Sequence, residues 1–182
     1  MNFIETAISG VWIIEPKVWG DARGYFVETF KQNLFEAKVG KVNFIQDNES
    51  KSSFGVLRGL HYQLGELSQA KLVRVIQGSV LDVAVDIRKS SATFGKYIAV
   101  ELTEENKRQL FVPRGFAHGF VVTSPEAVFV YKVDNIYSPE HECCIAYNDP
   151  SIGINWTIDE KELKLSAKDL KGVLLKDAKL FE

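Results

Sequence analysis

Apolar and polar residues alternate along much of the chain. The clearest example is the segment 79–87, SVLDVAVDI, in which every second residue is a large aliphatic one. A period of two places successive side chains on opposite faces and is typical of a β-strand. Similar stretches predict strands at 11–19, 23–30, 43–50, 56–63, 70–76, 97–103, 108–113, 117–123 and 127–137. Many short strands at regular spacing favour a sandwich or barrel over alternating strands and helices.

Turn and helix signals complete this pattern. Gly20-Asp21 lies between the first two strands and predicts a hairpin. Residues 33–40 form the one early helix candidate, which ends at Gly40. Ser166 is placed to cap a short helix through Asp169 and Leu170. No repeat, linker or low-complexity segment divides the chain. We therefore expect residues 1–182 to form one all-β domain, a jelly roll with minor helix.

The composition limits the function. Hydrophobic residues make up 46% of the 182 and charged residues 25%, as in ordinary globular domains. The formal net charge of -2 argues against a non-specific nucleic-acid binder, which needs a basic surface. The sequence shows no secretory signal and no apolar run long enough for a membrane span. Cys143 and Cys144 are adjacent, so we expect reduced thiols in a cytoplasmic protein.

The histidines suggest a broken metal motif. The segment 113–118, PRGFAH, matches the pattern P-x-G-x-x-H of the second cupin motif. Residues 55–61 match the start of the first, G-x5-H-x-H, but Gln63 occupies the place of its second histidine. A catalytic metal needs several such ligands to converge, so we expect a cupin-type barrel with no metal. His118 either orders the site or contacts a substrate, and His141 is expected in a solvated loop.

Seven longer stretches together resemble the dTDP-4-dehydrorhamnose 3,5-epimerase family. They follow one another in the family's order over nearly the whole chain. They are EPKVWGDARGYFVETF (15–30), FIQDNESKS (44–52), GVLRGLHYQ (55–63), QAKLVRVIQGSVLDVAVDIRKSSATFGK (69–96), LFVPRGFAHGFVV (110–122), YKVDNIYSPE (131–140) and LSAKD (165–169). The resemblance implies a cupin-type jelly roll, a homodimer, a dTDP-sugar substrate, and neither a metal nor a cofactor.

The resemblance also implies four catalytic residues. A 4-keto group acidifies the hydrogens on carbons 3 and 5, so a base can remove each proton and an acid can return one to the opposite face. His61 would be the base and Asp169 would orient it. Tyr131 would be the acid, and Lys71 would stabilise the enolate oxygen. Each residue taken singly has a simpler explanation in packing or solvation, and only their joint occurrence favours catalysis.

The nucleotide is expected to be held by polar groups. Guanidinium groups suit a diphosphate, and the resemblance points to Arg23 and Arg58, with Lys168 nearby. The other positions that match substrate-contacting residues of the family are Glu28, Gln46, Asp47, Asn48, His118 and Glu142. Tyr137 and Phe26 are the candidates for stacking on the base.

Two geometric expectations follow. Strict alternation would place Arg58 and His61 on opposite faces, so we predict a bulge or twist at Gly59. N-terminal strands in this fold often pack on a partner subunit, so we expect Arg23 and Glu28 to reach the site of a neighbouring copy.

Three alternatives stay open at this point. One is epimerisation at a single carbon, or keto-isomerisation, of a related nucleotide sugar. Another is a metal-dependent cupin that uses His61, His118 and His141. The last is a sugar-binding barrel without turnover, which the joint presence of base, orienter, acid and lysine argues against. The sequence does not order the two inversions or say how far the loop 64–69 closes over a ligand.

Overall fold

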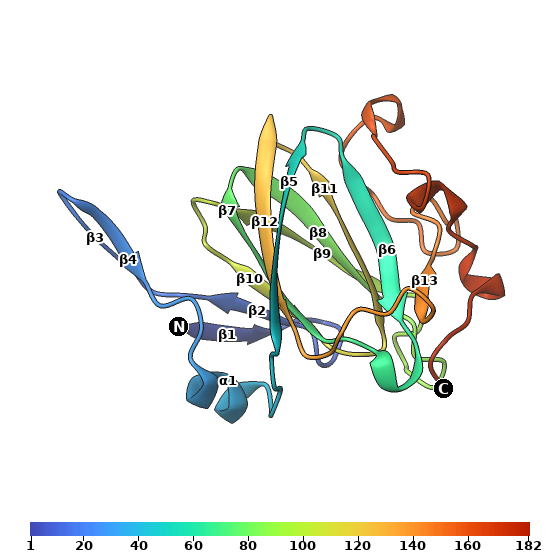
Figure 1. Cartoon of the computed structure of the whole chain (residues 1–182), viewed down its shortest axis with the longest axis horizontal. Coiled ribbons are helices and arrows are strands. Elements are labelled where there is room, and N and C mark those ends of the chain that lie inside the picture. Colours follow the sequence, from blue (N-terminus) through green and yellow to red (C-terminus); the bar gives the residue numbers. More distant parts are fainter.

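The computed structural model describes all residues, 1–182, and its regular secondary structure consists mainly of antiparallel strands (Figure 1). The strands are β1 (Asn2–Glu5), β2 (Trp12–Glu15), β3 (Val18–Asp21), β4 (Gly24–Val27), β5 (Gln46–Ser53), β6 (Leu57–Gln63), β7 (Lys71–Gln77), β8 (Ser79–Asp86), β9 (Tyr97–Thr103), β10 (Gln109–Val112), β11 (Phe116–Val122), β12 (Glu126–Val133) and β13 (Glu142–Cys144). One helix, α1 (Gln32–Lys38), interrupts them, and short 3-10 turns lie at Gly65–Leu67, Glu160–Glu162, Asp169–Lys171 and Leu175–Asp177. No helix is long and apolar enough to cross a membrane.

Two large sheets face each other across the main core. One has the order β1-β2-β10-β7-β12-β5 and the other β13-β6-β11-β8-β9, while β3 and β4 form a separate hairpin. Between the sheets, Val73 and Val75 of β7 and Phe129 of β12 pack against Phe116 and Phe120 of β11. This arrangement confirms the predicted all-β jelly roll of the cupin type with minor helix.

Each sheet is also covered on its outer face. Phe35 of α1 is 1% exposed and packs against Phe111, with ring centroids 5.1 Å apart, so the helix covers the six-stranded sheet. The C-terminal segment 145–181 covers the five-stranded sheet, where Val83 and Val85 are buried beneath it. The strand predicted at 79–87 is thus confirmed as β8. Its aliphatic face packs under the C-terminal segment, and the face that carries Asp82 points into the barrel.

The N-terminal hairpin differs from its prediction. Residues 11–19 form two strands: β2 joins the six-stranded sheet, and only β3 pairs with β4. The turn lies two residues later than predicted: Asp21 pairs with Gly24, so the chain reverses at Ala22-Arg23. The carboxylate of Asp21 accepts a hydrogen bond from the backbone N–H of Arg23 at 2.8 Å, which fixes this turn. The hairpin projects from the body of the molecule (Figure 1).

Both predicted helical segments are present, although the residues at which they begin and end differ from the prediction. Helix α1 ends at Lys38, and Gly40 follows at φ 125°, a conformation suited to glycine. Ser166 does cap a short turn: its Oγ accepts from the Asp169 N–H at 3.2 Å, and its own N–H donates to Asp169 Oδ2 at 3.1 Å. The short strands β1 and β13 carry no signal long enough to predict them.

Candidate active site

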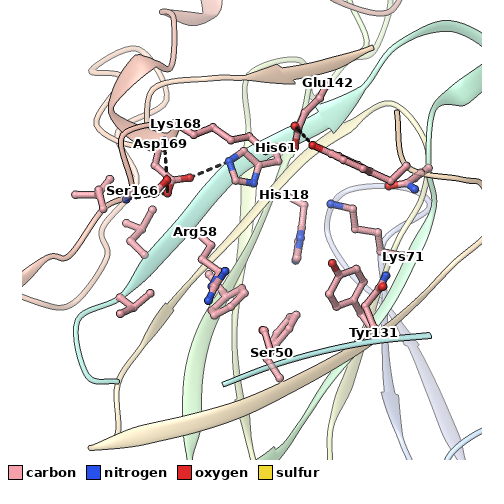
Figure 2. Close-up of a pocket in the computed structure, with 18 of the residues that line it drawn as sticks. Ser50, Arg58, His61, Lys71, His118, Tyr131, Glu142, Ser166, Lys168 and Asp169 are labelled. Atoms are coloured by element: carbon pink, nitrogen blue, oxygen red, sulfur yellow. Dashed lines mark hydrogen bonds and ion pairs between the residues drawn. The ribbon is translucent and has the colours of Figure 1, made fainter. Parts of the chain in front are cut away.

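A cavity of about 720 Å³ opens between the two sheets (Figure 2). Strands β5, β7 and β12 form one wall, β6 and β11 form the other, and the segment 164–169 lies along one side. The cavity meets the main core at Phe120 and Phe129, whose rings stack with centroids 4.1 Å apart. The side chains that chemistry needs enter it from both walls, as Figure 2 shows.

His61 projects into the cavity from β6, beside the buried carboxylate of Asp169. Its Nε2 lies 2.8 Å from Asp169 Oδ1, although the ring N–H does not point straight along this line. Asp169 is 4% exposed and also accepts from the backbone N–H of Gly59 at 3.1 Å and from the Ser166 hydroxyl at 2.5 Å. Figure 2 shows the other ring nitrogen of His61 facing the cavity. The carboxylate is thus fixed on several sides and in turn holds the imidazole.

The contacts of Asp169 keep it ionised. Burial alone would raise the pKa of this carboxyl, because a charge is costly away from water. The bonds from His61, Ser166 and the Gly59 N–H outweigh burial and hold the pKa well below its ordinary value. The structure thus sets a charged carboxylate beside the imidazole ring of His61.

Tyr131 and Lys71 enter the cavity from the opposite wall. Tyr131 of β12 pairs with Val73 of β7 and lies on the inner face with Phe129, as the alternation predicts. Lys71 also points inward, and its ammonium makes no ion pair or hydrogen bond with another side chain. Burial lowers the pKa of Lys71 to about 8, against a raising effect from Asp82 and Glu142. Burial also raises the pKa of Tyr131, so its hydroxyl keeps its proton.

His118 and Asp82 form a second buried pair behind the cavity. His118 Nε2 lies 2.9 and 3.0 Å from the two carboxylate oxygens of Asp82, and the strand pairing sets His118 beside His61. Burial lowers the pKa of His118, and the Asp82 charge opposes this. His118 thus bonds a core neighbour and also lines the cavity, a position compatible with either of the roles that its sequence left open.

The predicted irregularity at Gly59 is present. Strand pairing joins His118 to His61 and Phe120 to Arg58, so β6 has one more residue than β11 across this step. The bulge lets both Arg58 and His61 line the cavity, while Leu60 between them packs under the C-terminal segment. Gly59 has φ 135°, and a Cβ there would lie 2.5 Å from the Cα of Gly119, so only glycine fits.

Polar residues surround the cavity entrance. Glu142 accepts a hydrogen bond from the Tyr137 hydroxyl at 2.7 Å and pairs with the Lys168 ammonium at 2.5 Å. Burial would raise the pKa of Glu142, but these two partners lower it below its usual value. Across the cavity, the Gln46 amide donates to Asn48 Oδ1 at 2.8 Å, and both residues line the wall.

Four predicted contact residues lie outside the cavity of their own chain. Asp47 is on the other face of β5 and pairs with Lys132 at 2.9 Å, because alternation turns it away from its two neighbours. Arg23 is 90% exposed at the tip of the projecting hairpin, and Phe26 is on the same hairpin. Glu28 pairs with Lys31 at 2.7 Å, also away from the cavity.

The three histidines do not form a ligand set. His141 bonds the Ser138 hydroxyl at 2.9 Å in an exposed loop, away from His61 and His118. No group of three or more His, Cys, Asp or Glu side chains converges anywhere in the structure. The alternative that relies on a three-histidine metal site therefore lacks its ligands.

Three residues in or behind the cavity are not identified as site residues by the sequence patterns. Ser50 continues the alternation of Gln46 and Asn48 along β5, so the period of two could have found it. Asp82 looks like the polar half of an ordinary half-buried strand, and its role depends on the pairing of β8 with β11. Ser166 is predicted only as a helix cap, whereas its hydroxyl also fixes the carboxylate beside His61.

Comparison with known proteins identifies the family of this chain. The profile of the family described as dTDP-4-dehydrorhamnose 3,5-epimerase matches residues 5–177. The dTDP-4-dehydrorhamnose 3,5-epimerase of Shigella flexneri is 57% identical over 182 residues, which cover 100% of this chain and 99% of the relative.

Solved structures agree with this match. The crystal structure of dTDP-4-dehydrorhamnose 3,5-epimerase from Elizabethkingia anophelis NUHP1 has 51% identity and a TM-score of 0.94, covering 97% of each chain. The dTDP-6-deoxy-D-glucose-3,5-epimerase from Legionella pneumophila, solved in complex with dTDP-4-keto-L-rhamnose, has 48% identity and a TM-score of 0.96. That match covers 100% of this chain and 97% of the other.

Proposed function

The chain belongs to the dTDP-4-dehydrorhamnose 3,5-epimerase family, and on that premise we propose how its cavity carries out the family's reaction. The protein is an isomerase of dTDP-L-rhamnose biosynthesis. It epimerises carbons 3 and 5 of dTDP-4-dehydro-6-deoxy-D-glucose and gives dTDP-4-dehydro-L-rhamnose. The residues that perform each step are the subject of the proposal.

His61 removes the proton from the carbon next to the keto group. Asp169 at Nε2 favours the tautomer with its hydrogen on that nitrogen, which leaves the lone pair of Nδ1 for the substrate. When the proton arrives, the carboxylate stabilises the resulting imidazolium. Lys71 places an unpartnered ammonium where the 4-keto oxygen becomes an enolate, and it stabilises that charge.

Tyr131 returns a proton from the other side of the sugar. The observation that carries this proposal is that His61 and Tyr131 come from opposite sheets and face one cavity (Figure 2). Inversion requires removal on one face and return on the other, and two opposed walls supply that geometry. Because burial raises the pKa of Tyr131, its hydroxyl is a proton donor at neutral pH.

Two variants test these roles. His61→Ala should abolish exchange of the substrate hydrogens with solvent at both carbons. Tyr131→Phe should keep proton removal but impair correct return, because the base survives without the acid. The matched controls are His141→Ala, in an exposed loop, and Tyr147→Phe, which removes a hydroxyl that bonds Glu160 away from the cavity. Normal rate and stereochemistry in Tyr131→Phe would remove Tyr131 from the mechanism.

We assign binding of the nucleotide to residues around the cavity entrance. Arg58 and Lys168 place cationic groups for the diphosphate, and Tyr137 offers an exposed ring for the base. His118, Gln46, Asn48 and Glu142 supply the remaining polar contacts of this wall and rim.

The enzyme acts as a homodimer in this proposal, with the β3–β4 hairpin of each copy at the other copy's cavity. The hairpin projects from the body and exposes Trp19, Tyr25 and Phe26, at 42%, 61% and 65%. Such apolar exposure on an isolated hairpin needs a covering surface. Arg23 and Glu28 would then contact the substrate of the partner site.

Subunit mixing tests the shared site. Arg23→Ala and His61→Ala should each be inactive, whereas a refolded equimolar mixture should recover about a quarter of wild-type activity, because half the dimers are mixed and hold one intact site. An active monomer by light scattering, or a mixture that stays inactive, would contradict the proposal.

A further inference from the structure

Gln63 occupies the position where the first cupin motif would have its second histidine, yet its side chain does not line the cavity. It is the last residue of β6 and is 4% exposed. A buried carboxamide must use its two donors and its acceptor, or it costs stability. The partners that Gln63 uses therefore show what it does in place of binding a metal.

The carboxamide of Gln63 bonds on both sides of Tyr137. Its Nε2 donates to the carbonyl of Ile136 at 3.0 Å, and its Oε1 accepts from the backbone N–H of Ser138 at 2.7 Å. The second Nε2 hydrogen goes to the carbonyl of Leu67 at 2.6 Å. The side chain thus imitates a peptide group of a neighbouring strand, with Tyr137 held between the two bonds.

Other hydrogen bonds fix the two ends of this segment: Asn135 Nδ2 donates to the carbonyl of Glu66 at 2.7 Å, and the carbonyl of His141 accepts from the Leu64 N–H at 3.1 Å. Residues 134–141 run from β12 to β13 without helix or strand, and the Tyr137 ring is half-exposed. The ring's only hydrogen bond is from its hydroxyl to Glu142. A second amide, Gln69, bonds the carbonyl of Asn135 at 2.8 Å, just before the clamped residues. Side-chain amides, rather than a strand ladder, therefore set the path of the chain at the entrance.

We propose that Gln63 is a positioning residue for nucleotide binding, which fixes the backbone on either side of Tyr137 so that the ring meets the base. The inference rests on the proposed role of Tyr137 at the entrance and goes beyond it. It predicts that loss of the clamp weakens binding of the dTDP part while the proton-transfer residues stay in place, because the hydrogen bonds of the Gln63 carboxamide go to Leu67, Ile136 and Ser138 and to none of the proton-transfer residues.

A double-mutant cycle tests the proposal through dTDP binding, which needs no turnover. Calorimetry would give Kd for dTDP with the wild type, Gln63→Met, Tyr137→Ala and the double variant. Base–aromatic stacking is worth enough for Tyr137→Ala to weaken binding by about tenfold. Gln63→Met should weaken it by a similar factor, and the double variant should bind no worse than Tyr137→Ala alone. Methionine keeps the volume of the side chain, and Gln77→Met, at an exposed glutamine, is the matched control.

Kinetics separate this role from general damage. Gln63→Met should raise KM for the dTDP-sugar and leave kcat within about twofold, since the acid–base groups are untouched. A conservative Gln63→Glu variant keeps the acceptor for Ser138 and should retain part of the affinity. Equal losses from Gln63→Met in the wild-type and Tyr137→Ala backgrounds, or a folded Gln63→Met with normal dTDP affinity, would overturn the proposal. A wild type that binds dTDP without epimerising the sugar would overturn the catalytic proposal alone.

Discussion

Replacing Asp169 by asparagine tests whether the buried carboxylate makes His61 a base. Four donors meet this side chain: the His61 ring, the Gly59 N–H, and the N–H and hydroxyl of Ser166. A carboxylate accepts from all four, whereas an amide has one oxygen and must turn its NH2 toward one pair of them. The variant therefore loses the negative charge and places at least one N–H against another.

The cost follows from the charge that forms on His61. With charge centres about 4 Å apart, an imidazolium and a carboxylate attract by about 4 kcal/mol at the effective dielectric of a protein surface. The His61 side chain is 23% exposed, so solvent reduces this to about 3 kcal/mol. Because the charge on His61 forms as the proton is transferred, the loss raises the activation free energy by about 3 kcal/mol. This corresponds to a drop in kcat of about two orders of magnitude. KM should change little, because Asp169 stands behind the base.

The assay is exchange of the carbon 3 hydrogen in heavy water, followed by proton NMR. Asp177→Asn, in the neighbouring turn Leu175–Asp177, is the control for a lost surface carboxylate. Thermal unfolding of both variants shows whether the fold survives. An Asp169→Asn enzyme that is folded and exchanges at more than half the wild-type rate would refute the dependence of His61 on this carboxylate.

Three further predictions use other parts of the structure. Since burial lowers the pKa of Lys71 to about 8, kcat/KM should fall above that pH as the ammonium deprotonates, and Lys71→Arg should move this alkaline limb upward; an unchanged limb in the pH–rate profile would contradict it. Burial alone would raise the pKa of Asp86, but hydrogen bonds from three neighbouring side chains lower it from 3.8 to about 2, so the carboxylate contributes about 2 kcal/mol of stability above pH 4 that is lost as the pH falls from 4 to 2. Urea unfolding of Asp86→Asn should therefore show a shallower acid dependence than wild type, and an equally steep one would rule the linkage out. Gly59→Ala should reduce the free energy of unfolding by about 3 kcal/mol, because φ and the close Gly119 backbone both exclude a Cβ, and a urea midpoint within error of wild type would show that the bulge relaxes.

Local periodicity predicted most of the fold. The alternation along β8 gave a strand close to its observed bounds, and the glycine between Arg58 and His61 predicted the bulge that turns both into the cavity. The strand predicted at 127–137 is too long, because β12 ends at Val133 and residues 134–137 form a loop. Short elements such as β1 and β13 were not predictable, because three or four residues carry too little pattern and depend on their partner strands. The separation of β2 from β3 likewise depends on pairing with β10, which is distant in the sequence.

Some residues of the site were predictable from the sequence, and others depend on contacts between distant parts of the chain. The family's motifs identified His61, Asp169, Tyr131 and Lys71, and the structure brings all four to one cavity. Strict alternation already separates Asp47 from Gln46 and Asn48, so its position away from the cavity follows from the strand period. The pairing of Asp82 with His118 and the clamp around Tyr137 join residues far apart in the chain, which no local pattern reveals.

The central claim is two-sided proton transfer at two carbons within this cavity. The most direct measurement is incubation of the wild-type enzyme with dTDP-4-dehydro-6-deoxyglucose in heavy water, with deuterium located by NMR and mass spectrometry. The account predicts label at both carbon 3 and carbon 5 in the inverted product. Label at one carbon only, or tight binding of dTDP without any label, would contradict it.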